Sequence, residues 1–216
     1  MTLKMIAFSF SGLLVHYKDA DNAWDLIRSI YQIPNFWKEY KEGRMSRNTI
    51  RTEEYKAWKS KGVKLDKLMI DLRKNMKLGI GVEKVFNDLH DRKIATAIIS
   101  DSPNLVVEDV AHQLGAKYFA CNKILFTQEG IAYDTIPSHP SKDGRVSKLL
   151  ALRDFVNREG VKLAETAFVG NDREDIEAFR FVERSIAFNA KDHETVKAAQ
   201  IKVNSNTLED VLEYLK

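Results

Sequence analysis

Short apolar runs alternate with amphipathic segments along most of the chain. The run that begins at residue 5 and the runs over 94–99 and 166–169 lack a polar face, as is typical of strands buried on both faces. Over residues 82–89, apolar positions recur at i, i+3, i+4 and i+7, which predicts a helix. This alternation predicts an α/β fold, a parallel sheet with right-handed crossovers and helices on both faces. The same criteria predict strands at 118–120, 185–188 and 201–203, a hairpin over 126–134, and helices over 107–114, 145–159, from 174 onward, and over 208–215.

The segment over residues 17–79 interrupts the alternation. Its apolar residues keep helical spacing from Trp24 to Tyr31, Pro34 breaks that pattern, and residues 47–59 and 65–76 indicate further helices. We therefore expect a helical cap over 17–79, inserted into a core domain formed by residues 1–16 and 80–216.

Composition limits the class of protein. A content of 44% hydrophobic and 30% charged residues is that of an ordinary globular protein, and the single cysteine, Cys121, excludes an intramolecular disulfide. No apolar run reaches the ~18 residues of a membrane-spanning helix, and no signal-peptide pattern is present, so we expect a cytoplasmic protein without membrane contact. A net charge of +3 is too small to indicate nucleic-acid binding.

Charge and aromatic residues are concentrated in the cap. Residues 17–79 hold 15 Lys or Arg against 9 Asp or Glu, and all three tryptophans, Trp24, Trp37 and Trp58, lie there. Such a surface could contact a protein partner, although lysine-rich helix faces are usually only solvated.

The first strand ends in what resembles a catalytic motif without its carboxylates. The frame Ser9-Phe-Ser11-Gly12-Leu13-Leu is similar to the first motif of the haloacid dehalogenase superfamily, Asp-x-Asp-Gly-Thr-Leu. In that family the first Asp attacks a phosphoryl group and the second is the acid/base. Here Ser9 and Ser11 stand at those positions, and Leu13 replaces the Thr.

Three further motifs follow in the family's order. Ser100 closes the apolar run over 94–99 and fits the second motif, whose hydroxyl holds a phosphoryl oxygen. Lys148 precedes Gly170 by 22 residues, as the third-motif lysine does in the phosphoserine-phosphatase-like branch. Gly-Asn171-Asp172-Arg-Glu-Asp175 fits the fourth motif, Gly-Asp-x-x-x-Asp, with Asn171 in place of its first Asp. The resemblance implies the superfamily's Rossmannoid core with a cap.

The resemblance also implies where metal would bind. In the family, the nucleophile's carboxylate and the first Asp of the fourth motif bind Mg²⁺, and both are replaced here, by Ser9 and Asn171. Neutral oxygens are poorer Mg²⁺ ligands than carboxylates, so we expect no tightly bound cofactor. Asp172 and Asp175 are the candidate metal ligands if the protein is an enzyme, although Asp172 is also a suitable helix cap.

The remaining polar groups form a candidate anion site. The backbone N–H groups at Ser11-Gly12, together with Ser100 and Lys148, would cradle a phosphate, and we expect this pocket to be net positive because its carboxylates are missing. Where phosphoserine enzymes carry a cap glutamate that meets the substrate's amino group, this chain has Lys18, so phosphoserine specificity is not implied. Arg44, Arg47 and Arg51 are candidate anion ligands from the cap, or an exposed helix face.

The absent carboxylates decide the expected function. A serine hydroxyl is a weak nucleophile without a base, and His16, the nearest candidate, is at a position typical of a surface or hinge residue. We therefore expect a catalytically impaired phosphatase homologue that binds a small phosphorylated or anionic ligand, or a partner. The alternatives are a slow, Mg²⁺-dependent phosphomonoesterase that recruits Asp172 and Asp175, and a protein-interaction module with a vestigial pocket.

Overall fold

The computed structural model describes residues 2–216, apart from the side chains at positions 41, 47 and 48. Its main sheet has seven strands in the order β6-β5-β4-β1-β7-β8-β9, and only β5 and β6 are antiparallel. The predicted α/β class is thus confirmed, and β1 lies at the centre of the sheet between β4 and β7. The strands are β1 (Met5–Phe8), β4 (Ala95–Pro103), β5 (Tyr118–Phe126), β6 (Ala132–Pro137), β7 (Thr166–Gly170), β8 (Arg184–Phe188) and β9 (Ile201–Val203).

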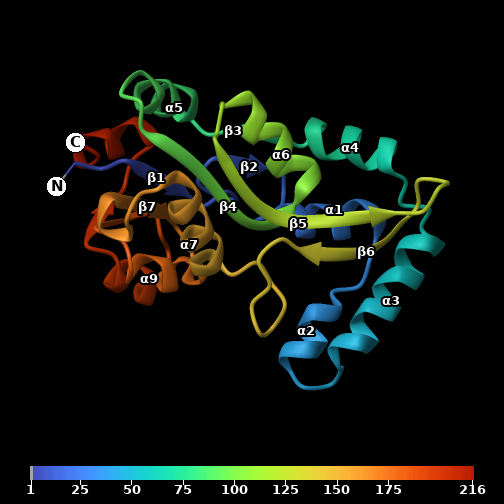
Figure 1. Ribbon diagram of the computed structural model, residues 1–216. Coiled ribbons are helices and arrows are strands. Elements are labelled where there is room, and N and C mark those ends of the chain that lie inside the picture. Colours follow the sequence, from blue (N-terminus) through green and yellow to red (C-terminus); the bar gives the residue numbers. More distant parts are fainter. Residues whose placement is uncertain (1) are drawn as a thin grey trace.

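Helices cover both faces of this sheet (Figure 1). The apolar faces of α5 and α6 form one buried cluster with Phe8, and those of α7 and α8 form a second cluster around Phe168 on the opposite side. The helical elements of the core are α5 (Val82–Asp91), α6 (Asn104–Gln113), α7 (Lys148–Glu159), α8 (Ile176–Phe179), α9 (His193–Ala198) and the 3-10 segments η1 (Leu163–Glu165), η2 (Arg173–Asp175) and η3 (Leu208–Tyr214).

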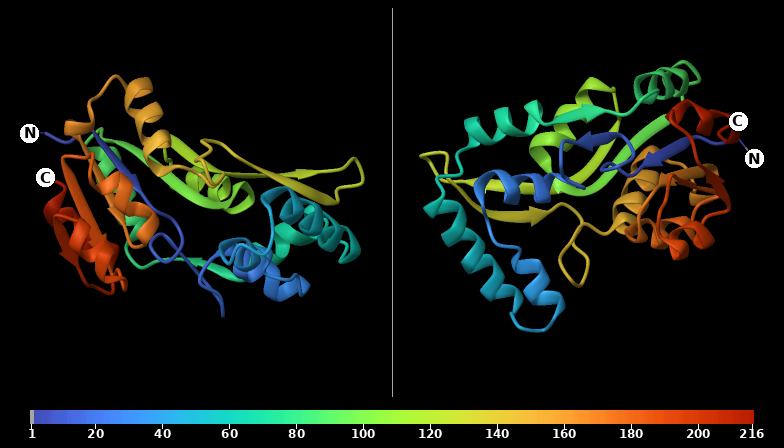
Figure 2. Two further views of the ribbon diagram at one scale, coloured as in Figure 1. Left: turned by 90° about the horizontal axis from the view of Figure 1, so that it is seen from below. Right: turned by 180° about the vertical axis from the view of Figure 1, so that it is seen from behind.

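A two-stranded antiparallel sheet, β2 (Val15–Tyr17) with β3 (Met76–Leu78), lies where the chain leaves and re-enters the core. Between these strands lie four helices: α1 (Ala23–Tyr31), α2 (Phe36–Lys41), α3 (Arg47–Ser60) and α4 (Leu65–Lys74). We keep 17–79 as the proposed extent of this cap. Its helices run alongside the β5–β6 hairpin, at the end of the molecule opposite both termini (Figures 1 and 2).

The cap is packed onto the core by apolar contacts. Leu26 and Leu68 of the cap are buried in the same cluster as Phe8 and Phe86 of the core. Each such side chain contributes on the order of 1.5–3 kcal/mol when it is withdrawn from water. Among the described residues, no helix combines the length and the hydrophobicity needed to cross a bilayer.

Several predicted boundaries are wrong. The strand at 118–120 and the hairpin at 126–134 form one long hairpin, β5 with β6, because the intervening residues Asn122 and Lys123 continue β5 by pairing with Pro137 and Ile136 of β6. The last segment is a 3-10 helix, and α9 was not predicted although Asp192 caps it by accepting from Thr195 N. The helix over 145–159 begins only at residue 148, where Ser147 Oγ accepts from Leu150 N.

Candidate functional site

The four motifs meet at the carboxyl edge of the three central strands. Ser9 follows β1, Ser100 lies in β4, and Asn171 follows β7. Phe8 pairs in register with both Ile98 and Val169, so these three segments end side by side. Ligands of open α/β sheets bind at this edge. The structure therefore gathers the residues that the sequence motifs singled out.

Lys148, the first residue of α7, is buried between two of these strand ends. Its Nζ donates to Ser9 Oγ at 2.9 Å and forms an ion pair with Asp175 Oδ1. Burial opposes the charged form of Lys148, but the attraction of Asp175 and then of Glu174 outweighs it and raises the pKa of the ammonium group. The expected net-positive pocket is wrong, because the Asp175 carboxylate neutralises this lysine.

Both carboxylate oxygens of Asp175 contact other groups of the protein. Its Oδ2 accepts hydrogen bonds from Asn171 N (2.8 Å) and Asp172 N (2.9 Å), and the residue is fully buried. Gly170 permits this packing, because a Cβ there would overlap the Asp175 carboxylate. Asp175 is thus a structural anchor for the fourth-motif loop and the counter-ion of Lys148.

Asn171 makes a direct contact with the first motif. Its Nδ2 donates to the backbone carbonyl of Ser11 at 3.1 Å, whereas its Oδ1 is buried without a hydrogen-bond partner among the described residues. Gly12 has φ +74°, and a Cβ at that position would lie 2.8 Å from Asn171 Nδ2. The Gly12 N–H donates to Val15 O at 2.8 Å, so the expected anion contact from this N–H is not formed.

A cluster of hydroxyl groups lies beside these residues. Ser11 Oγ and Ser102 Oγ share a hydrogen bond of 3.1 Å, and Ser102 N donates to Ser100 Oγ at 3.0 Å. Ser100 therefore does not cap a helix; β4 continues to Pro103. The Tyr17 hydroxyl is buried near Ser11 and Ser102 without hydrogen-bond geometry to a described group, and burial raises its pKa. The motifs did not single out Tyr17; a sequence signal for it is the alternation Val15-His16-Tyr17 directly after the first motif, which indicates a short strand with Tyr17 on its buried face.

These residues do not fit Mg²⁺. Both oxygens of Asp175 already accept hydrogen bonds, and Asp172 Oδ1 accepts from Arg173 N at 2.5 Å as the cap of η2. Asn171 Oδ1 is one neutral acceptor, and Mg²⁺ prefers carboxylates. Within the described part of the chain, no three His, Cys, Asp or Glu side chains are placed to hold a metal ion.

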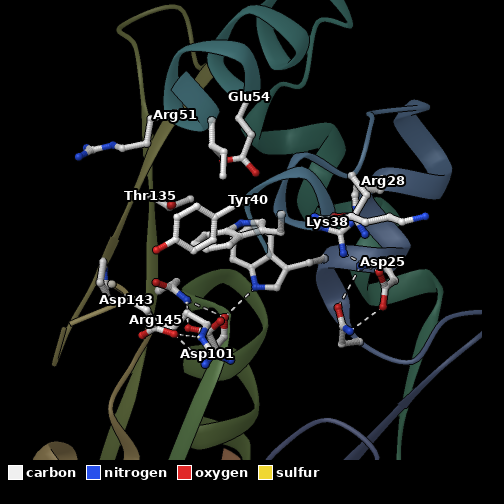
Figure 3. Close-up of a pocket in the computed structure, with 18 of the residues that line it drawn as sticks. Asp25, Arg28, Lys38, Tyr40, Arg51, Glu54, Asp101, Thr135, Asp143 and Arg145 are labelled. Carbon is white, nitrogen blue, oxygen red and sulfur yellow. Dashed lines mark hydrogen bonds and ion pairs between the residues drawn. The ribbon is translucent and has the colours of Figure 1, made fainter. Parts of the chain in front are cut away.

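A cavity of about 680 Å³ lies between the cap and the core (Figure 3). None of the eight motif residues predicted for the site lines it. Its core side is formed by the neighbours of motif residues, Asp101 and Glu174, together with Arg145. All three tryptophans line the cavity from the cap.

Asp101 connects the cavity to the sheet edge. Its carboxylate accepts from Asn122 Nδ2 (2.7 Å) and Val146 N (2.9 Å), and its backbone carbonyl accepts from Trp24 Nε1 (2.7 Å). Burial raises the pKa of Asp101 to about 6. In the sequence, Asp101 directly follows Ser100, the second-motif residue.

The cap arginines do not form the predicted anion site. Arg51 lines the cavity but is paired with Asp134, and Arg44 is paired with Glu39 and Glu42. The side chain of Arg47 lies outside the described residues. Lys18 is exposed and is not part of the cavity lining.

The sheet gathers four motif segments at its carboxyl edge, and a helical insertion follows the first of them. This arrangement defines a haloacid dehalogenase-type protein. Residues 20–182 match the family of haloacid dehalogenase-like hydrolases, and the chain belongs to that family. It is similar to the phosphoserine phosphatase of Methanocaldococcus jannaschii, with 23% identity over 214 residues that cover 99% of this chain and 98% of that protein.

Two solved structures support the same fold. One is a phospho-aspartyl intermediate analogue of phosphoserine phosphatase, with a TM-score of 0.75, 22% identity and full coverage of both chains. The other is a hydrolase of this family from Salmonella enterica serovar Typhi, with a TM-score of 0.79 and 16% identity; it covers all of this chain and 72% of that one. The expected superfamily and its phosphoserine-phosphatase-like branch are confirmed.

Proposed function

We propose that this protein is a phosphatase homologue that has lost efficient phosphoryl transfer and binds a phosphorylated or anionic ligand at the strand ends. The observation that carries the proposal is the environment of Ser9. Its hydroxyl accepts a hydrogen bond from Lys148 Nζ, and no carboxylate or imidazole is hydrogen-bonded to it among the described residues. A serine becomes an effective nucleophile only when a base takes its proton.

His16 does not supply that base. It lies exposed on β2, opposite Lys77. Its ring packs close to Gly79, where the chain returns to the core, since a Cβ added at Gly79 would lie 3.3 Å from His16 Nε2. Although the residue as a whole is exposed, its ring is partly desolvated, and this partial burial together with the charge of Lys77 lowers its pKa. These contacts support the interpretation of His16 as a hinge residue between cap and core.

Unused hydrogen-bonding groups support ligand binding. The Tyr17 hydroxyl and Asn171 Oδ1 are buried without partners among the described residues, and such groups usually destabilise a fold unless water or a ligand meets them. A phosphate oxygen that replaced the hydrogen bond between the Ser11 and Ser102 hydroxyls would also meet the Tyr17 hydroxyl, which lies beside both. The enzymatic alternative rests on the phosphatase relatives and would require Asp172 and Asp175 to leave their present hydrogen bonds.

Substitution of Tyr17 tests the binding proposal. Inorganic phosphate, titrated without Mg²⁺, should raise the melting temperature of the wild type saturably, since a ligand specific to the native state stabilises it. Tyr17→Phe removes one hydrogen bond to a charged group, worth ~1.5–3 kcal/mol, and should weaken phosphate binding roughly tenfold or more. Unliganded stability should not fall, because no partner is left unpaired. Tyr133→Phe, at an exposed position on β6, is the control.

An unchanged phosphate response in Tyr17→Phe would contradict this role of the hydroxyl. If wild type and variant both fail to respond to phosphate, the site is vestigial and the interaction-module alternative becomes the leading one.

A further inference from the structure

Four aromatic side chains from three cap helices wall the cavity. Trp24 of α1 and Trp58 of α3 lie with ring centroids 6.4 Å apart, and Trp37 and Tyr40 of α2 meet edge to face at 5.6 Å. Figure 3 shows Tyr40 in the middle of this lining. Such a concentration of ring faces in one cavity offers the negative faces of several π-systems to a bound group.

Among the acids that line the cavity, Glu54 is the one with neither an ion pair nor a hydrogen bond among the described residues; Asp101 also has no ion pair, but it accepts hydrogen bonds from Asn122 and Val146. Arg28 pairs with Asp25 at 2.5 Å, Arg51 pairs with Asp134, and Arg145 pairs with Asp143 and Glu174, while Lys38 is exposed. Figure 3 shows the Glu54 carboxylate directed into the cavity.

The lining as a whole is acidic. It contains four cations (Arg28, Lys38, Arg51, Arg145) and six acids (Asp25, Glu42, Glu54, Asp101, Asp143, Glu174), a formal charge of −2. An anionic ligand would meet more like charge than opposite charge here. A cation would meet aromatic faces and the unpaired Glu54 carboxylate.

The acceptors also select the kind of cation. Asp25, Asp101, Asp143 and Glu174 already accept hydrogen bonds from protein groups. A primary ammonium needs about three acceptors, whereas an alkylated ammonium needs few or none and is weakly hydrated. A volume of about 680 Å³ is within the range of small-molecule sites.

We infer that this cavity is a binding site for an organic cation of the alkylated-ammonium class, held by the four rings and by Glu54. The inference concerns residues other than the motif residues, so it stands or falls independently of phosphate binding at Ser9, Ser100 and Lys148. If both sites bind, the ligand is one that carries an anionic group and a quaternary or tertiary amine.

Choline and its uncharged isostere 3,3-dimethylbutan-1-ol are the probes, titrated separately into the full chain by calorimetry and tryptophan fluorescence. Choline should bind saturably and change the fluorescence, and the isostere should bind roughly tenfold more weakly or worse, because it lacks the charge. Glu54→Gln preserves shape and should reduce this preference several-fold, leaving only the part that the aromatic rings supply. Glu53→Gln, the neighbouring residue, which pairs with exposed Lys56, should leave it unchanged.

The pH dependence provides a second readout. Burial raises the pKa of Glu54 to about 7, with Arg28 opposing and Asp134 reinforcing the shift. Asp101, whose pKa is about 6, also lines the cavity. Asp25 and Arg51 are further charged residues of the same lining. Deprotonated Glu54 binds a cation better than the protonated form, so the affinity for choline should rise between pH 6 and 8. In Glu54→Gln, the rise in affinity near pH 7 should be lost.

Equal affinity for choline and the isostere, or a choline affinity that Glu54→Gln leaves intact, would overturn the assignment. So would the absence of any saturable response to choline in the wild type, whatever the result of the phosphate titration.

Discussion

Replacing Lys148 with alanine should lower the free energy of unfolding by about 3–5 kcal/mol, because it leaves the Asp175 carboxylate buried without its counter-ion. Lys148 is 6% exposed and Asp175 is fully buried, so water cannot substitute for the lost ammonium group. This expectation differs from that for a lysine lining an open anion site, whose removal would affect binding but hardly stability. The measurement is chemical denaturation at neutral pH.

Two comparisons isolate the pair. The double variant Lys148→Met with Asp175→Leu removes both charges and should be substantially more stable than Lys148→Ala alone. Lys84→Ala removes an exposed lysine that pairs with Glu209 and should change stability by no more than ~1 kcal/mol. If Lys148→Ala is as mild as Lys84→Ala, then Lys148 is not held as described.

Restoring the family's carboxylates should restore metal affinity before activity. In the triple variant Ser9→Asp, Ser11→Asp and Asn171→Asp, three added negative charges gather near the buried Asp175 and repel one another. Two unit charges ~4 Å apart interact by about 4 kcal/mol at an effective dielectric constant of 20, so Mg²⁺ should bind the variant at least about tenfold more tightly than the wild type.

The readout is the melting temperature with Mg²⁺ or with a chelator. Mg²⁺ should stabilise the triple variant and leave the wild type unchanged. Turnover should stay low in the variant, because Leu13 still replaces the motif Thr and catalytic groups must be placed within ~0.5 Å. Equal responses of wild type and variant to Mg²⁺ would contradict the assignment of the replaced residues.

The fold was predictable because its signals are local. Apolar runs without a polar face became β1, β4 and β7, and parallel pairing then placed Ser9, Ser100 and Asn171 at one edge. The Lys148–Asp175 ion pair was not predicted, since two helix termini 27 residues apart in sequence meet only when both pack against β1 and β7. The motifs associate Lys148 with a phosphate and Asp175 with a metal ion, and they carry no signal that the two side chains meet.

The cavity was less predictable still. The aromatic residues were visible in the sequence, but nothing local shows that α1, α2 and α3 turn them toward one volume, or that Asp25, Asp134 and Asp143 neutralise the arginines there. Glu54 looked like any charged residue of a solvated helix. Its distinguishing feature, a carboxylate left without a partner, arises only from tertiary packing.

Catalytic impairment is tested most directly by the steady-state hydrolysis of 4-nitrophenyl phosphate with Mg²⁺ by the wild-type chain. We expect a turnover number below ~1 s⁻¹, the lower end of ordinary enzymes. Ser9→Ala should leave any residual rate unchanged, because Ser9 has no base. A turnover number above that level which Asp172→Asn abolishes would contradict catalytic impairment and establish the enzymatic alternative.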